Sequence, residues 1–180
     1  MQYRNVEASQ LSITQLMLPC HSNFSGFVHG GYVLSLMDQV AFACASKHSA
    51  YYCVTASVNK VDFLTPIEVG DLLTLKASVN YTGRTSMVIG IRVESENIKT
   101  GITKHCNSSY FTMVAKDETG NSVSVPGLIL NSEQSIRRFT RSIRRQKQTQ
   151  QRKESFNISE FKFEKYIQQI EHQNAIVELD

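Results

Sequence analysis

One long helical pattern of apolar residues, followed by four long segments of β-type sequence, constrains the fold of this chain more than any other feature. Within residues 32–49, directly after Gly30 and Gly31, apolar side chains recur at helical spacing. They are Val33, Leu34, Met37, Val40, Ala41 and Cys44. Because apolar residues cover most of the helix circumference, we expect this helix to be buried.

Four segments after this helix have the composition of strands. Each is rich in valine, isoleucine, threonine, tyrosine or phenylalanine, often in alternation. They are residues 52–64, 71–81, 86–94 and 103–115. Turn residues such as Gly70, Gly83 and Gly101 separate them, and short connections favour antiparallel neighbours. With one strand before the helix, this order predicts an α+β domain whose sheet wraps a single helix.

The 180 residues are enough for one ordinary core, and the composition changes beyond Pro126. We therefore expect a catalytic domain over residues 1–130 and a basic helical extension over residues 131–180. Residues 131–153 and 158–170 each predict a helix, and the second has an apolar stripe that docks on the core or on another subunit. Residues 137–153 carry eight basic side chains and no acidic one. Such a segment can be a solvated helix, a phosphate-binding arm or a nucleic-acid patch.

Several classes of protein are not indicated by this sequence. No apolar run approaches the length of about 20 residues that spans a bilayer, and the first residues lack the pattern of a secretion signal, so we expect a cytoplasmic protein. The four cysteines are scattered without a C-x-x-C pair or a regular spacing from histidines. We expect free, buried cysteines and no metal site.

Asp38 is the residue whose position most needs an explanation. It lies between Met37 and Val40 in the apolar helix, where a carboxylate is costly to desolvate unless it is paired or functional. In one reading it accepts hydrogen bonds and orders the core. In the other it deprotonates a water molecule or attacks a carbonyl carbon. Both readings predict that Asp38 is buried.

The Gly30–Gly31 pair at the start of the helix is the second candidate. Without side chains, the two glycines allow a ligand to approach the free backbone N–H groups, where the helix dipole favours negative charge. These N–H groups can stabilise a thioester oxygen as it becomes an oxyanion. A tight turn or close packing of the helix on the sheet explains a glycine pair equally well.

The spacing between these candidates predicts a site that is shared by two subunits. Seven residues of α-helix separate Gly31 from Asp38, a rise of about 10 Å, which is too far for both to touch one reacting carbon. A symmetric dimer can bring Asp38 of one subunit to the glycine N–H groups of the other.

Three clusters of residues, in a fixed order, carry a resemblance to a known family. They are Asn23, Gly26, Gly30, Gly31 and Asp38, then residues 61–63 with Pro66, Gly70 and Asp71, then residues 83–87. Together they cover residues 11–126 and resemble the bacterial and mitochondrial-type acyl-CoA thioesterases of the hot-dog superfamily. The resemblance implies a hot-dog fold: a curved antiparallel sheet around one long central helix, here with a C-terminal helical extension. It also implies dimers with one continuous sheet and a trimer of dimers.

The same resemblance implies the reaction and the roles in it. Acyl-CoA is hydrolysed to a free carboxylic acid and coenzyme A, with Asp38 as general base or nucleophile and Asn23 of the other subunit orienting water or the thioester. No cofactor is expected, because coenzyme A is part of the substrate.

The resemblance also implies where the coenzyme A moiety binds. Arg84, Thr85 and Ser86 are expected near its phosphates and pantetheine arm, where a cation and hydroxyl donors suit anionic oxygens. Lys60 is a further candidate for this site.

His29 and the basic extension depart from the family pattern and keep two alternatives open. Hot-dog dehydratases use a histidine with an acid, so His29 can be a second acid or base; otherwise it is a tolerated substitution or a hydrogen-bonding group at the helix start. The chain can also be a non-catalytic acyl-CoA sensor with a nucleic-acid-binding tail. The tail has no evident helix-turn-helix pattern, and aromatic residues are not regularly interleaved with its positive charges, which does not favour nucleic acid.

Overall fold

The computed structural model describes residues 2–155 and 174–176. The chain divides into two units, residues 1–142 and 143–180. The first unit contains the sheet and the central helix. Of the second, the structure describes the continuation of α3 (Glu133–Ser155) and residues 174–176. The helix expected at 158–170 lies outside the described residues. No helix among the described residues is long and apolar enough to span a membrane.

Five antiparallel strands form one curved sheet in the order β2-β4-β5-β6-β3. They are β2 (Leu11–Leu16), β3 (Tyr52–Val58), β4 (Leu72–Thr82), β5 (Ser86–Glu96) and β6 (Thr103–Lys116). The four strands expected after the helix are confirmed, although the first ends at Val58 and not at Leu64. Register shifts interrupt β3, β4 and the β5–β6 pairing, and such bulges increase strand bending and twist.

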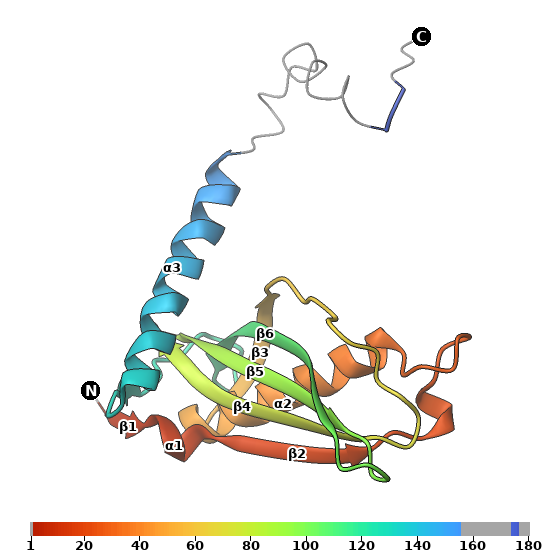
Figure 1. Cartoon of the computed structure of the whole chain (residues 1–180). Coiled ribbons are helices and arrows are strands. Elements are labelled where there is room, and N and C mark those ends of the chain that lie inside the picture. The colour runs from red at the N-terminus through yellow and green to blue at the C-terminus, as the bar shows by residue number, and fades with distance from the viewer. Residues whose placement is uncertain (1, 156–173, 177–180) are drawn as a thin grey trace. The chain divides into compact units, whose positions relative to one another are not determined.

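The single long helix, α2 (Gly30–Ser49), lies against the concave face of this sheet (Figure 1). It begins after the N-cap residue His29 and ends at Ala50, which adopts the left-handed conformation with φ 63°. Arg4 donates hydrogen bonds to the carbonyl oxygens of Lys47 and His48, so two of the last helical carbonyls have a partner. The helix surrounded by a curved antiparallel sheet confirms the expected hot-dog fold.

Short elements complete the first unit. The strands β1 (Tyr3–Asn5) and β7 (Gly127–Ile129) pair in parallel, α1 (Val6–Ser9) precedes β2, and a 3₁₀ turn, η1 (Pro19–His21), precedes α2. The N-terminal part of α3 packs on β4, where Phe139 contacts the ring of Tyr81 at a centroid distance of 5.0 Å.

The expectation that α2 is buried around most of its circumference is wrong. Val33, Met37 and Val40 face the sheet and are almost fully buried. Another stripe is exposed to solvent in the single chain: Leu34, Asp38 and Phe42, spaced four residues apart. A sheet on one side can cover only one face of a helix, so the remaining apolar residues stay uncovered in a single chain.

Three of the four cysteines are buried as expected, and Cys20 is not. Cys44, Cys53 and Cys106 lie in the core, whereas Cys20 is exposed in the 3₁₀ turn. Burial raises the pKa of the Cys44 thiol to about 12, which keeps it protonated and unreactive at neutral pH.

His48, near the end of α2, is buried at 1% exposure, and its ring forms a hydrogen bond with the carbonyl oxygen of Pro126 at 3.0 Å. Its Nδ1 atom is buried without a partner. Burial lowers the pKa of His48 below the ordinary value of 6.5, and the nearby Arg4 acts in the same direction. His48 is therefore neutral in the folded protein at pH 7.

This lowered pKa predicts a pH dependence of stability. A histidine with a lower pKa in the folded than in the unfolded chain binds fewer protons when folded, so its contribution is complete above pH 6.5 and is lost as the pH falls below it. We expect the free energy of unfolding, measured with urea at a fixed protein concentration, to fall more steeply from pH 7 to pH 5 in the wild type than in His48→Gln. Equal slopes would contradict this assignment.

Candidate active site

A cavity of about 380 Å³ lies at the N-terminal end of α2. One wall comes from the loop before the helix and its first turn, including Asn23, Phe27 and Gly30. The other wall comes from residues 63–67, which follow β3. The cavity is thus largely apolar, with Asn23, Thr65 and the start of a helix as its polar elements, a combination typical of small-molecule sites.

Asn23 is held in a tight turn that fixes the direction of its side chain. Its Oδ1 atom accepts hydrogen bonds from the N–H groups of Ser25 (2.9 Å) and Phe27 (3.2 Å). The backbone N–H of Asn23 also donates to the Phe27 carbonyl at 2.7 Å. Because both interactions occupy Oδ1, the Nδ2 group is the part of Asn23 that is available to donate to a ligand.

The two glycines at the start of α2 have different environments. The Gly31 N–H donates to Nδ1 of His29 at 2.9 Å, so His29 caps the helix through its side chain. The His29 ring lies so close that a Cβ atom on Gly31 would be 2.8 Å from its Cε1 atom. No hydrogen-bond partner for the Gly30 N–H is found among the described residues, and Gly30 lines the cavity.

The Gly31 N–H therefore already has a partner in His29, whereas the Gly30 N–H has none within the described residues. For His29, the hydrogen-bonding role considered from the sequence is confirmed.

Asp38 forms a short hydrogen bond with a residue that the sequence alone did not indicate. The hydroxyl group of Thr55 in β3 lies 2.5 Å from Oδ1 of Asp38. The same oxygen is 3.4 Å from the Met113 sulfur, but its single proton is better donated to the carboxylate. Both Asp38 and Thr55 are exposed in the single chain, which corrects the expectation that Asp38 is buried.

A β-bulge directly follows Thr55 and helps to explain its orientation. The pairing of β3 with β6 shifts between Thr55 and Ser57, so one extra residue is accommodated at this point. Bulges change the direction of neighbouring side chains and are frequent beside active sites. A threonine in a strand is ordinary, and no sequence signal distinguishes Thr55 from the other strand threonines.

The structure brings together some of the expected site residues and separates others. Asn23 and Gly30 share the cavity, whereas Asp38 is not among the residues that line it. Gly30 and Asp38 are eight helical residues apart, a rise of about 12 Å. Within one chain, therefore, the candidate residues form two separate half-sites.

The expected coenzyme A-binding residues do not line the cavity either. Arg84, Thr85 and Ser86 form the β4–β5 hairpin, which is closed by a hydrogen bond from the Gly83 N–H to the Ser86 carbonyl. Strand β4 has 11 residues and spans about 36 Å, and the cavity wall of residues 63–67 precedes its opposite end. Lys60 is exposed and pairs with Asp62 at 3.0 Å.

A metal site would need several clustered ligands. Within residues 2–155 and 174–176, no group of three or more His, Cys, Asp or Glu side chains is arranged to hold a metal ion.

A curved sheet around one helix, with an apolar cavity at the helix start and a carboxylate on its exposed side, defines a hot-dog protein of the thioesterase type. The model of the thioesterase superfamily matches residues 25–102. The chain is 43% identical to Protein VdlD of Helicobacter pylori over 77% of this chain and 79% of that protein. A structure described as an apo-hexameric acyl-CoA thioesterase is 38% identical, with a TM-score of 0.82, and covers 84% of this chain and 97% of its own. This chain belongs to the thioesterase superfamily.

A further relative has been solved in several forms. An acyl-CoA hydrolase from Staphylococcus aureus is 26% identical, with a TM-score of 0.80, over 86% of this chain and 95% of its own. That structure carries an aspartate-to-alanine substitution, and another structure of the enzyme carries a threonine-to-alanine substitution 17 positions further along the chain. A third contains butyryl coenzyme A and coenzyme A.

The capping role of His29 predicts a specific change in stability. We expect His29→Ala to lower the free energy of unfolding by about 1 kcal/mol, because the Gly31 N–H loses its side-chain partner. His29→Asn, which supplies another side-chain acceptor, should recover most of this loss in urea denaturation. Equal losses in both variants would show that the cap contributes nothing.

Proposed function

We propose that this protein is an acyl-CoA thioesterase that hydrolyses acyl-CoA to a carboxylic acid and free coenzyme A, with Asp38 as general base or nucleophile. The observation that carries the proposal is the hydrogen bond between Thr55 and Asp38. The two residues are 17 positions apart, the same spacing as the substituted aspartate and threonine of the Staphylococcus aureus acyl-CoA hydrolase. The thioesterase family and the apolar cavity beside a helix start support the same activity.

The geometry of the pair suits activation of water. Thr55 donates its proton to Oδ1, so the second oxygen of the Asp38 carboxylate is free to accept a proton from a water molecule. The hydroxide so formed adds to the thioester carbonyl carbon, and the carbonyl oxygen becomes an oxyanion. When the C–S bond breaks, the coenzyme A sulfur takes the proton back from Asp38. In the nucleophilic alternative, the carboxylate attacks the same carbon and the C–S bond breaks, which releases the coenzyme A thiolate. Water then hydrolyses the acyl-aspartate to the carboxylic acid and the free Asp38 carboxylate, and the proton released from the water goes to the thiolate. Neither route needs a cofactor.

The cavity supplies groups that complement this chemistry. The Gly30 N–H, at the positive end of the α2 dipole, is the proposed donor to the oxyanion. Asn23 presents Nδ2 as a second donor, which orients the thioester oxygen or the attacking water. Both groups are held by backbone structure, so little reorganisation is needed when the oxyanion forms.

A second copy of the chain is proposed to join the two half-sites. Beside Asp38, the apolar side chains of Leu34 and Phe42 are exposed, and Phe42 packs edge-to-face against Tyr52 of β3 at 5.5 Å. Strand β3 is also an edge of the sheet, with unpaired backbone groups on its outer side. A two-fold interface on this surface would cover the apolar stripe and bring Asp38 to the cavity of the partner subunit. Three such dimers would make a hexamer, the state named for the 38%-identical structure.

The proposed binding of the coenzyme A moiety uses the β4–β5 hairpin. Arg84 is exposed and has no side-chain partner within the described part of the chain, and Thr85 and Ser86 add hydroxyl donors beside it. A free guanidinium group and hydroxyls suit phosphate oxygens. Lys60 would contribute only if it exchanged Asp62 for a phosphate.

The role of Asp38 is tested by substitution. We expect purified wild-type protein to release free coenzyme A from members of a panel of short to long acyl-CoAs, and Asp38→Asn to be at least about 100-fold slower, the usual scale for a lost general base. Thr55→Val, which keeps the carboxylate but loses its hydrogen bond, should lie between the two, and Thr55→Ser should retain activity. Glu118→Gln, which alters an exposed carboxylate in a remote turn, is the matched control. An active Asp38→Asn enzyme would overturn the assignment.

Sharing of the site between subunits is tested by complementation. Asn23→Ala and Asp38→Asn are expected to be inactive alone. When the two chains are unfolded together and refolded as a mixture, half of the dimers are mixed, and each has one site with both native residues, so about a quarter of wild-type activity should return. Recovery would be absent if Asn23 and Asp38 acted within one chain. Size-exclusion chromatography of each variant establishes that assembly is intact.

A further inference from the structure

The ring of Phe63 lies directly against the start of α2. A Cβ atom placed on Gly30 would be 3.3 Å from Cζ of Phe63, 3.5 Å from Cε2 and 3.7 Å from Cε1. The outer edge of the ring therefore points at the Gly30 backbone, and the absence of a side chain on Gly30 makes this contact possible. Phe63 also forms part of the cavity wall.

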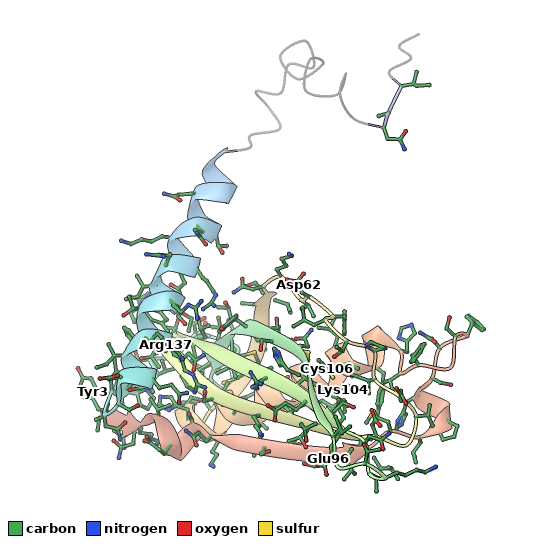
Figure 2. All side chains as sticks on the ribbon, in the orientation of Figure 1. Tyr3, Asp62, Glu96, Lys104, Cys106 and Arg137 are labelled. Atoms are coloured by element: carbon green, nitrogen blue, oxygen red, sulfur yellow. The ribbon has the colours of Figure 1, made fainter. Side chains whose placement is uncertain are left out.

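The segment that carries Phe63 is fixed on both sides of this residue. The N–H of Leu64 donates to the carbonyl oxygen of Cys106 at 2.9 Å, and Nδ2 of Asn107 donates to the carbonyl oxygen of Asp62 at 3.0 Å. Asp62 and Cys106 are labelled in Figure 2, on the segment after β3 and on β6. Asn107 is fully buried, so its side chain holds the segment at a fixed position on β6. The position of the ring is thus set by β6 and not by its own packing alone.

Only half of the Phe63 ring is covered within the chain. Its exposed fraction is 52%, although large apolar side chains gain about 1.5–3 kcal/mol from full burial. Phe63 and Gly30 line the same cavity, and the Gly30 N–H has no partner within the described residues. The Phe63 ring next to the free Gly30 N–H therefore suits a ligand with a polar acceptor atom and an apolar group beside it. The acceptor atom would bind the N–H, and the apolar group would contact the ring.

We infer that Phe63 determines acyl specificity by limiting the space around the carbon atoms next to the thioester carbonyl, so that unbranched acyl groups are preferred. This inference rests on the proposed thioesterase function. It adds a selection by shape close to the reacting carbon, distinct from selection by chain length at the far end of the cavity.

The proposed oxyanion contact fixes where the acyl group lies relative to the Phe63 ring. A carbonyl oxygen bound by the Gly30 N–H lies about 3 Å from its nitrogen. The edge of the Phe63 ring touches the same residue, so the acyl carbons nearest to the carbonyl are the ones that meet the ring. A methyl branch at the adjacent carbon must either displace the anchored ring or shift the carbonyl from the donor. One methylene group in an apolar pocket typically changes kcat/KM by about 10- to 200-fold.

The experiment compares two isomeric substrates, butyryl-CoA and isobutyryl-CoA, which differ only in branching at this carbon. We expect the wild type to prefer butyryl-CoA by at least about tenfold in kcat/KM, and Phe63→Ala to narrow this ratio by about tenfold. Phe63→Tyr keeps the ring and should keep the ratio. Ile136→Ala, which removes an equally exposed apolar side chain from the N-terminal part of α3, is the control for unspecific effects.

The possible outcomes separate the inference from the function on which it rests. The inference is supported if the ratio of kcat/KM for butyryl-CoA to that for isobutyryl-CoA falls in Phe63→Ala and in no other variant. An unchanged ratio, or an equal loss of activity on both substrates, overturns the inference but leaves the thioesterase function intact. A wild type that hydrolyses neither thioester also overturns the inference, and the thioesterase function fails only if no member of the panel of short to long acyl-CoAs is hydrolysed. Circular dichroism and the thermal midpoint of each variant identify any loss of folding, and Phe63→Leu offers a smaller truncation if the alanine variant is unstable.

Discussion

The concave face of the sheet buries Val33, Met37 and Val40 of α2, and the candidate site residues take their positions from this contact. It directs one face of the helix inward, and a rigid helix must then direct the stripe of Leu34, Asp38 and Phe42 outward. It also fixes the helix start beside the segment of residues 63–67, which creates the cavity. One packing interaction therefore produces both half-sites and holds them about 12 Å apart along the helix axis.

The parts of this arrangement that depend on local sequence could be predicted, and those that depend on distant contacts could not. The periodicity of the apolar residues and the turn residues correctly indicated α2, the strands and their antiparallel arrangement, because these features are encoded within short segments of the sequence. The helical pattern did not reveal which apolar residues the chain itself covers. Leu34 and Val33 are equally apolar, and only the curvature of the sheet decides that one is exposed and the other buried.

The same distinction applies within the candidate site. Asp38 was conspicuous because a carboxylate in an apolar helix is costly, whereas its partner Thr55 is an ordinary strand residue 17 positions away. The contact is made by the packing of α2 on β3, which no local pattern encodes. His29 shows a related limit: a histidine before two glycines can act as a cap or as an acid, and the sequence does not show that its ring accepts a hydrogen bond from the Gly31 N–H in the folded chain.

In the proposed shared site, separation of the half-sites would couple assembly to activity by simple geometry. The single chain exposes Leu34, Phe42 and Tyr52 around Asp38, an apolar surface that water does not favour, and leaves β3 with an unpaired edge. If a second copy covers this surface, burial of the apolar side chains stabilises an arrangement in which the carboxylate lies at the partner's cavity. The same contact excludes water from the cavity, which strengthens the electrostatic contacts there. Because the symmetry of a dimer repeats every contact, one chain with two incomplete half-sites yields two complete sites. The exposed stripe of α2, costly in isolation, then becomes the feature that makes a shared active site possible.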